Sequence, residues 1–168
     1  MSFIETDRLL LRTWILPGDI SDAQDLFVCE DAQRYYVRGT LRHDDVAAYV
    51  ARLIAKEERD GFGVWPVVEK ESRSLVAACG LTRVPDLGND VEVDWIVKPS
   101  ARGRGIALEA AQSVLSYAFS QTPLPRVSAL IDPGNSASIA IANRLGMRFD
   151  RIVRAYKRDL MRYIKERS

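Results

Sequence analysis

A strand that passes through a glycine-containing loop into a helix constrains this sequence more than any other feature. Apolar residues alternate with other residues over Val91–Val97, which is the period of a β-strand. Gly103 and Gly105 follow in the loop, and apolar residues then recur at helical spacing over Ile106–Phe119. The order strand, loop, helix indicates a chain that packs helices on a sheet.

The other periodic segments predict a mixed sheet. Helical spacing is found after Asp19, over Asp44–Arg59 and over Ser136–Leu145. Strands are predicted at Arg8–Thr13, Phe62–Val68, Leu75–Thr82 and Arg126–Ile131, and two more within Met147–Lys165. Consecutive strands form antiparallel hairpins and strand–helix–strand steps are parallel, so the expected fold class is α/β (α+β). No linker or repeat interrupts the sequence, and we expect residues 1–168 to form a single domain.

One predicted strand contains a proline. Pro66 lies inside Phe62–Val68, and proline has no N–H to donate within a sheet. We therefore expect this strand at a sheet edge, or a bulge at Pro66.

Composition excludes several classes of function. The 24 basic and 23 acidic residues leave a formal net charge of +1, so we expect neither a nucleic acid nor a membrane as the main partner. His43 is the single histidine, and Cys29 and Cys79 lack the spacing of metal ligands, so we expect no metal and free thiols. No basic run precedes an apolar N-terminal stretch, which favours a cytoplasmic protein without a signal peptide.

The start of the helix after Gly105 has the features of an anion site. Helix N-termini present unpaired N–H groups and the positive end of the dipole, and glycine lets a phosphate approach the backbone. Arg102 and Arg104 add positive charge. A dinucleotide-binding loop would need a third glycine at Leu108, so that class fits badly. A glycine pair is also found at ordinary helix starts without a ligand.

These residues resemble a known family. The segment Arg102–Ala107 resembles the Arg/Gln-x-x-Gly-x-Gly/Ala coenzyme A pyrophosphate loop of the GNAT acetyltransferase superfamily. Four further blocks are similar, in order, to the branch that contains the ribosomal-protein N-terminal acetyltransferases: Glu5–Arg12, Glu92–Ile96, Asp132–Ser138 and Leu145–Arg148. The resemblance covers nearly the whole chain.

The resemblance implies a fold and a coenzyme site. The expected fold is a twisted mixed sheet of about seven strands and about four helices, whose central strands splay apart. Acetyl-CoA would be the acetyl donor, with its pantetheine arm paired to the backbone of Trp95–Val97. The residues implied in coenzyme binding are Trp95, Ile96, Val97, Arg102, Gly103, Arg104, Gly105, Ile106, Ala107, Asn135 and Ser138.

The resemblance also implies a direct transfer to a primary amine in a ternary complex. Glu92 is the expected general base, with the oxyanion held by a backbone N–H of Trp95–Val97. Ala142 stands where many relatives have an acidic tyrosine, so Ser138 is expected to protonate the leaving thiolate. The alternatives are a Glu92 that faces solvent or pairs with an arginine, and a Ser138 at a helix start that is bonded to backbone. Asp94 replaces the usual glycine, which points to a different acceptor.

The acceptor and the class of protein leave alternatives open. The amine is either a protein N-terminus or a small molecule, and Tyr35, Tyr36 and Arg38 fall where the family places part of its acceptor site. A non-catalytic module that senses coenzyme A, or mediates interactions, would share this fold. The protein is expected to be a monomer or a homodimer. The basic C-terminal tail, which includes Arg162, is expected to form a solvated face, with contact to an acidic substrate or to the 3′-phosphate of the coenzyme as the alternative.

Overall fold

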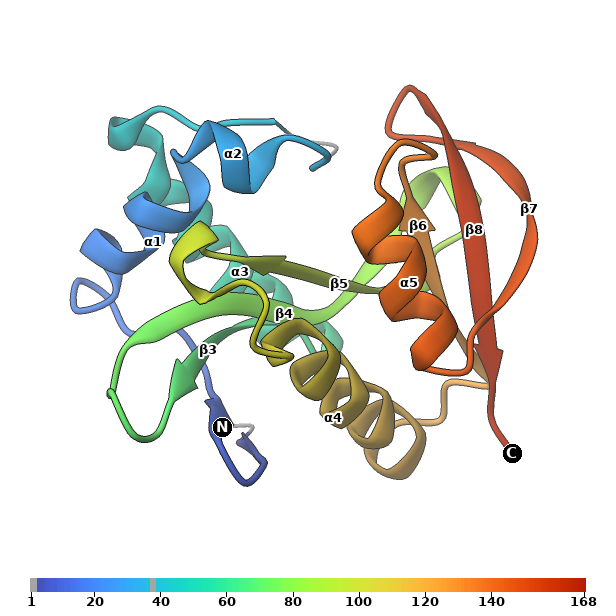
Figure 1. Cartoon of the computed structure of the whole chain (residues 1–168), viewed down its shortest axis with the longest axis horizontal. Coiled ribbons are helices and arrows are strands. Elements are labelled where there is room, and N and C mark those ends of the chain that lie inside the picture. The colour runs from blue at the N-terminus through green and yellow to red at the C-terminus, as the bar shows by residue number, and fades with distance from the viewer. Residues whose placement is uncertain (1–2, 37–38) are drawn as a thin grey trace.

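The computed structural model describes residues 3–36 and 39–168, and Figure 1 shows its arrangement. A single mixed sheet has the strand order β1-β2-β3-β4-β5-β6-β8-β7. Its strands are β1 (Ile4–Glu5), β2 (Leu9–Leu11), β3 (Val64–Glu69), β4 (Leu75–Val84), β5 (Asp90–Val97), β6 (Arg126–Ile131), β7 (Arg148–Ala155) and β8 (Arg158–Glu166). The described sheet has one strand more than expected because β1 is too short to show a period in the sequence.

Helices cover both faces of the sheet. They are α1 (Ile20–Phe27), α2 (Glu30–Gln33), α3 (Val46–Asp60), α4 (Ile106–Gln121) and α5 (Ser136–Arg144). One core lies between the sheet and α4 and α5, and a second lies between the sheet and α1 and α3. The four-residue α2 adds to the four helices that we expected. No helix in the described part of the chain is long and apolar enough to cross a bilayer.

Pro66 is accommodated by the short length of β2. The proline lies opposite Ala78 of β4, in an inner strand of the sheet. On its other side, β2 pairs with β3 only at Val67, Val68 and Glu69, so Pro66 lies beyond the reach of β2. The register shift falls between Val67 and Val68. The expected edge position is therefore wrong, and the irregularity falls after Val67 and not at Pro66 itself.

The sheet splits between β5 and β6. Strand β5 pairs with β4 along its whole length, from Val97 opposite Ala77 to Asp90 opposite Val84. It pairs with the parallel β6 at one position, Glu92 opposite Ser128. Beyond this bridge the two strands diverge in Figure 1, because β6 follows β8 instead. The splayed central strands that we expected are present.

A buried charge cluster holds the closed end of this split. Arg162 of β8 is 4% exposed, and its Nη2 donates to Asp90 Oδ2 of β5 at 2.6 Å. Ser128 of β6 donates to the same oxygen at 2.7 Å and accepts from Arg162 Nε at 3.2 Å. Three strands thus meet at one ion pair. The expected solvated face is wrong for Arg162.

Candidate active site

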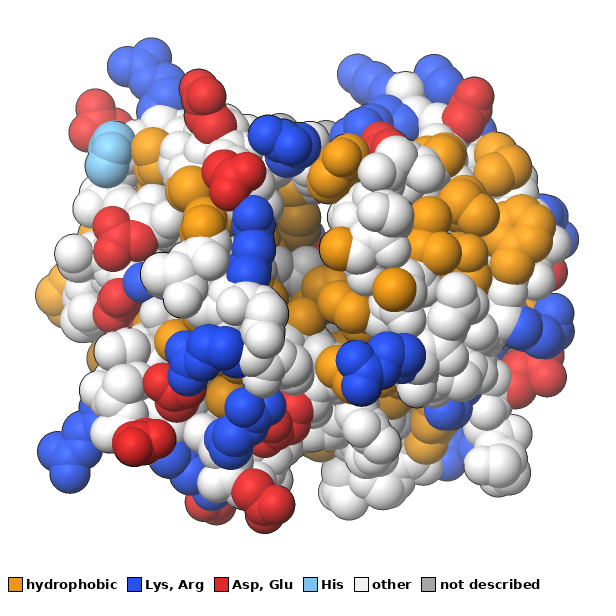
Figure 2. All heavy atoms as spheres, in the orientation of Figure 1, with side chains coloured by type: hydrophobic (Ala, Val, Ile, Leu, Met, Phe, Trp, Pro, Cys, Tyr) orange, Lys and Arg blue, Asp and Glu red, His pale blue; other side chains and the backbone are white. Residues whose placement is uncertain are grey.

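The split opens into a cleft of about 1110 Å³. Figure 2 shows the molecule hollowed between its two halves, with hydrophobic side chains in the depth. Both expected parts of the site line this cleft. One part is the loop before α4, which contributes Arg102, Gly103, Gly105, Ile106 and Ala107. The other is the start of α5, which contributes Asn135 and Ser138. Strand β5 lies between them and contributes Glu92 and Trp95–Val97. Arg104 points instead toward Glu69 of β3, to which it donates.

The loop before α4 is built on two left-handed glycines. Gly103 has φ +74° and Gly105, the N-cap of α4, has φ +77°. A Cβ at Gly103 would meet nothing within 4 Å, so the backbone conformation, not crowding, requires glycine here. This turn leaves the first N–H groups of α4 without helical partners at the cleft.

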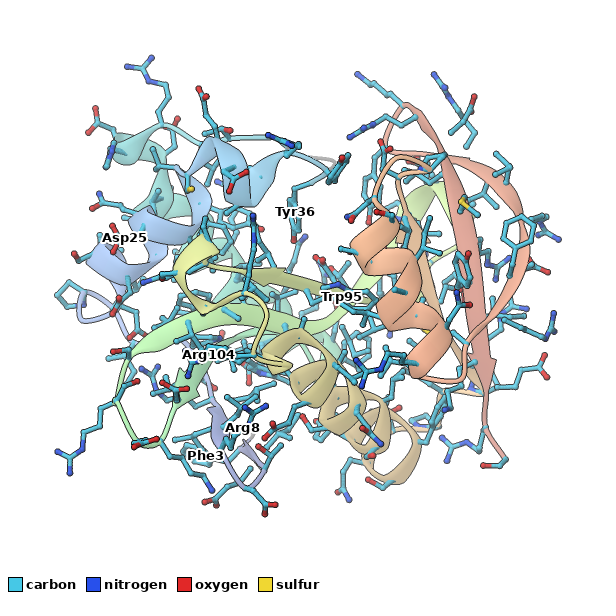
Figure 3. The ribbon with its side chains drawn as sticks, viewed as in Figure 1. Phe3, Arg8, Asp25, Tyr36, Trp95 and Arg104 are labelled. Atoms are coloured by element: carbon cyan, nitrogen blue, oxygen red, sulfur yellow. The ribbon has the colours of Figure 1, made fainter. Side chains whose placement is uncertain are left out.

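The arginines of the loop are held by carboxylates. Arg102 Nη1 lies 2.9 Å from Asp31 Oδ2 of α2, and both side chains are about half exposed. Arg8 donates to the carbonyl oxygen of Arg104 at 2.9 Å and pairs with Glu109 of α4 at 2.6 Å. Figure 3 shows Arg8 and Arg104 near the start of α4. Arg8 therefore links the loop to α4 from the solvent side, a contact that the sequence did not indicate.

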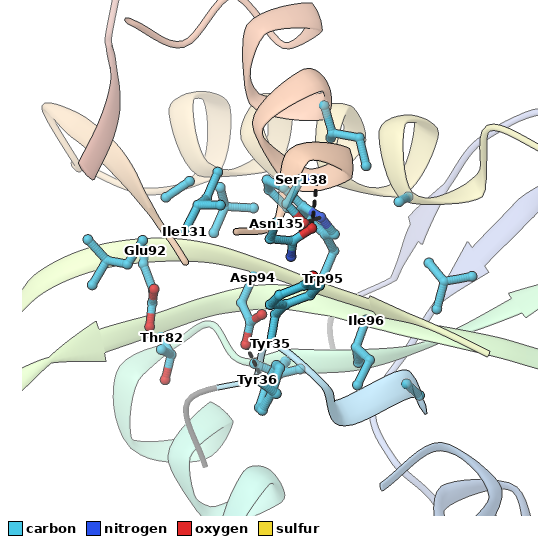
Figure 4. Close-up of a pocket in the computed structure, with 18 of the residues that line it drawn as sticks. Tyr35, Tyr36, Thr82, Glu92, Asp94, Trp95, Ile96, Ile131, Asn135 and Ser138 are labelled. Carbon is cyan, nitrogen blue, oxygen red and sulfur yellow. Dashed lines mark hydrogen bonds between the residues drawn. The ribbon is translucent and has the colours of Figure 1, made fainter. Parts of the chain in front are cut away.

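Asn135 and Ser138 form a capping pair at the start of α5. Asn135 Oδ1 accepts from the Ser138 backbone N–H at 3.1 Å, while its Nδ2 donates to Ser138 Oγ at 3.0 Å. Trp95 Nε1 of β5 donates to the same Oγ at 3.2 Å (Figure 4). The hydroxyl of Ser138 is therefore bound by side chains, and neither bond uses its hydrogen. The alternative was a serine bonded to backbone, whereas both of these bonds to the hydroxyl come from side chains.

Glu92 is buried at the inner end of the cleft. It is 7% exposed, and its Oε1 accepts from the Tyr156 hydroxyl at 2.5 Å. Burial, then the charge of Asp94, raises the pKa of Glu92 from 4.5 to about 8, while the Tyr156 bond acts in the opposite direction. The alternative of a solvent-facing Glu92 is wrong, and the side chain that bonds its carboxylate in the described part of the chain is a tyrosine, not an arginine.

Asp94 lies on the same face of β5 as Glu92. The alternation of the strand places both carboxylates toward the side of α1 and α3. The hydroxyl of Tyr36, which follows α2, donates to Asp94 Oδ2 (Figure 4). Tyr35 also lines the cleft, whereas Arg38 lies outside the described residues. The Tyr36 bond brings part of the expected acceptor region to the β5 carboxylates.

Tyr156 is the site residue that sequence reasoning missed. It lies in the two-residue turn between β7 and β8, where Tyr156 and Lys157 have φ of +51° and +61°. Such turns are usually marked by glycine or asparagine, and neither is present here. The one signal in the sequence was the expected pair of C-terminal strands, because the turn between them carries Tyr156 to the split.

The family follows from these features. The pattern of the acetyltransferase (GNAT) domain family matches residues 8–148. The chain therefore belongs to the GNAT family of acetyltransferases, as the resemblance implied. Among its relatives are two Bacillus subtilis proteins. YkkB is 28% identical over 86% of this chain and 92% of its own length. YoaA, described as an N-acetyltransferase, is 25% identical over 91% of this chain and 86% of its own length.

Solved structures have the same fold. An acetyltransferase from Agrobacterium tumefaciens C58 superposes with a TM-score of 0.85 at 22% identity, covering 99% of this chain and 95% of that one. The Salmonella typhimurium enzyme described as modifying the N-terminal serine of ribosomal protein L7/L12 superposes with a TM-score of 0.82 at 14% identity. The match covers 98% of this chain and 99% of that one. RimL in complex with coenzyme A gives 0.80 at 14%, covering 98% of each chain. At these identities the likeness concerns the fold.

Proposed function

We propose that the protein transfers the acetyl group of acetyl-CoA directly to a primary amine, within a ternary complex in the split of the sheet. One observation carries this proposal. A helix N-terminus built for an anion and a buried carboxylate that can accept a proton line the same cleft, at opposite ends of β5. Holding both reactants in one cleft would supply much of the rate acceleration.

The coenzyme is assigned to the side of α4. Its pyrophosphate would accept from the N–H groups after Gly103 and Gly105, with Ile106 and Ala107 in the first helical turn. The pantetheine amides would pair with the β5 backbone at Trp95, Ile96 and Val97, where the sheet leaves the edge toward β6 open within the described residues. Arg102 would exchange its exposed pair with Asp31 for a phosphate, which costs little because such pairs are weak.

Glu92 is assigned as the general base. A primary ammonium has a pKa near 10, so it must lose a proton before nitrogen can attack the thioester carbonyl. A base whose pKa is about 8 is partly ionised at neutral pH and still strong enough to accept that proton. The burial of Glu92 also favours a catalyst over a module that binds coenzyme A without turnover.

Ser138 is assigned to the leaving group. As the tetrahedral intermediate collapses, the carbon–sulfur bond breaks and the leaving sulfur takes the hydroxyl proton of Ser138. The serine regains a proton from the positively charged nitrogen that attacked, which leaves a neutral amide and coenzyme A as a thiol. Trp95 and Asn135 both donate to Ser138 Oγ, so the hydroxyl hydrogen is left to face the sulfur. The oxyanion would be held by a backbone N–H of Trp95–Val97. Ala142, buried on α5, offers no hydroxyl for this step.

The acceptor is assigned to the opposite side of β5, next to Glu92 and Asp94. Two carboxylates there suit an ammonium group, and the cleft is large enough for a peptide end as well as for a small amine. The N-terminal serine named for the Salmonella structural neighbour supports a protein N-terminus as the first class to test.

The test is thiol release from acetyl-CoA with a panel of acceptors that contains N-terminal peptides, ribosomal proteins and small amines. The proposal predicts steady release that depends on the acceptor, with one acetyl group added to its amine. Tight binding of acetyl-CoA without release for any acceptor would contradict it and favour a coenzyme A-sensing module.

A further inference from the structure

The hydroxyl of Tyr156 contacts the carboxylate of Glu92 from the far side of the split. The oxygens are 2.5 Å apart, although the residues are 64 positions apart in the chain. Glu92 belongs to β5, whereas Tyr156 lies at the tip of the β7–β8 hairpin. The contact therefore joins two parts of the sheet that meet only at the closed end of the cleft.

The turn that carries Tyr156 is held in an unfavourable conformation by its surroundings. Left-handed backbone is unfavourable for a residue with a side chain, and both Tyr156 and Lys157 adopt it. The Tyr156 backbone N–H donates to Asp86 Oδ2 at 2.7 Å, which ties the turn to the β4–β5 connection. The Tyr156 ring also packs on a small core of Val84, Ala155 and Leu160. Ring and backbone are both fixed, so the hydroxyl is aimed at Glu92 rather than merely near it.

We infer that Tyr156 is a positioning residue for the transfer, whose hydroxyl holds the Glu92 carboxylate in one orientation and favours its ionised, proton-accepting form. This inference rests on the proposed role of Glu92 as the base. Helix α5 has Ala142 where many relatives have a tyrosine, so Tyr156 is a tyrosine that reaches the site from another element. We assign Tyr156 to the base, Glu92, and not to the leaving thiolate.

The direction of the effect follows from the chemistry of the pair. A hydroxyl donates to a carboxylate but gains much less from a carboxylic acid, so the bond lowers the pKa of Glu92. Burial and the carboxylates of Asp94 and Asp90 raise it. The pKa of Tyr156 is itself raised, by burial and then by the charge of Glu92, so the hydroxyl stays a donor at all working pH values.

Three arginines on the strands beside the pair form ion pairs with other carboxylates. Arg83 of β4 lies 3.4 Å from Asp60, and Arg162 of β8 is bound to Asp90. Arg158 of β8 is paired with Asp132 after β6. Among the side chains that shift the pKa of Glu92, that of Tyr156 favours the charged form, whereas Asp94 and Asp90 oppose it.

The experiment compares the full-length protein with Tyr156→Phe, which keeps the ring and removes the donor. In the variant, turnover at neutral pH should fall several-fold, and the rising limb of the pH profile should move up by about half a pH unit or more. At high pH the deficit should shrink, and acetyl-CoA affinity should not change. Tyr117→Phe is the matched control, because its hydroxyl donates to the Gly61 carbonyl away from Glu92. That variant should keep the wild-type profile.

A second readout needs no acceptor. The carboxyl carbon of Glu92, followed by NMR in glutamate-labelled protein and assigned with Glu92→Gln, should titrate near pH 8 in the wild type and higher in Tyr156→Phe. An unchanged titration in folded Tyr156→Phe would overturn the inference. If the titration moves while Glu92→Gln keeps full activity, the contact stands but Glu92 is not the base, and the proposed mechanism fails on its own.

Discussion

The indole Nε1 of Trp95 donates to the hydroxyl oxygen of Ser138 at 3.2 Å, and this bond joins β5 to α5 across the mouth of the split. The same oxygen accepts from Asn135 Nδ2 at 3.0 Å. Two donors thus fix the position of Ser138 and leave its hydrogen for a third partner. In the proposed reaction that partner is the sulfur of coenzyme A.

Removing this hydroxyl should affect the chemistry more than binding. Ser138→Ala should lower kcat by about tenfold or more, because the thiolate loses its proton donor, and should leave acetyl-CoA affinity within about twofold. Steady-state assays of thiol release measure kcat, and calorimetry measures the affinity for acetyl-CoA. Ser116→Ala, on the exposed side of α4, is the control. A kcat for Ser138→Ala within about twofold of wild type would assign the proton to another group or to water.

The coenzyme loop can be tested with two substitutions that differ only in charge. Gly105→Asn and Gly105→Asp both place a side chain at φ +77°, a conformation that both residues tolerate better than most. Only Asp brings a negative charge to the pyrophosphate. We expect acetyl-CoA to bind Gly105→Asp about tenfold or more weakly than Gly105→Asn, with both proteins folded by circular dichroism. Equal affinities for the two would argue against a phosphate at this loop.

The buried base should cost stability at high pH. The pKa of Glu92 is raised in the folded protein from 4.5 to about 8, so folding favours the protonated form. Its contribution is fully present below about pH 4.5 and is lost as the pH rises through about 8. Each pH unit in this window accounts for about 1.4 kcal/mol, which makes a difference of several kcal/mol.

Glu92→Gln cannot ionise and should escape this loss. Its free energy of unfolding, relative to wild type, should rise by several kcal/mol between about pH 5 and about pH 9. Urea denaturation of both proteins at each pH measures the difference, and contributions common to both proteins cancel. A difference that does not change with pH would mean that Glu92 is not buried as a carboxylic acid.

The closed end of the split should depend on Arg162. Arg162→Met removes the buried cation from the largely buried Asp90 and leaves it only the longer contact with the more exposed Arg126 at 3.5 Å. Breaking a buried pair costs about 3–5 kcal/mol. Arg154→Met removes an exposed pair with Asp159 and should cost under about 1 kcal/mol. Denaturation midpoints compare the two variants. Similar small losses for both would show that the cluster does not hold the strands together.

Elements with a strong period of their own could be predicted from the sequence. Strand β5, helices α3 and α4 and the loop with Gly103 and Gly105 were all found, because local spacing decides their structure. Helix α2 was missed, since four residues are too few to show a helical period. The splayed strands came from the resemblance and not from periodicity.

The surroundings of the site residues could not be predicted, because they depend on contacts between distant segments. Alternation places Glu92 on one face of β5, but it does not reveal that the tip of the β7–β8 hairpin brings Tyr156 to that carboxylate. Likewise, in the sequence Arg162 is one of many basic residues of the tail. Its burial beside Asp90 results from the pairing of β8 with β6, which the sequence does not show. The sequence identified the base candidate but neither its burial nor its partner.

The most direct test of the central claim is mass spectrometry of an amine acceptor after incubation with acetyl-CoA and the protein. The account predicts one added acetyl group on the primary amine, formed in step with free coenzyme A. With Gly105→Asp or Glu92→Gln at neutral pH, the yield should be strongly reduced. An acceptor panel that stays unmodified while acetyl-CoA binds in the cleft, or an acetyl yield that neither substitution lowers, would contradict it.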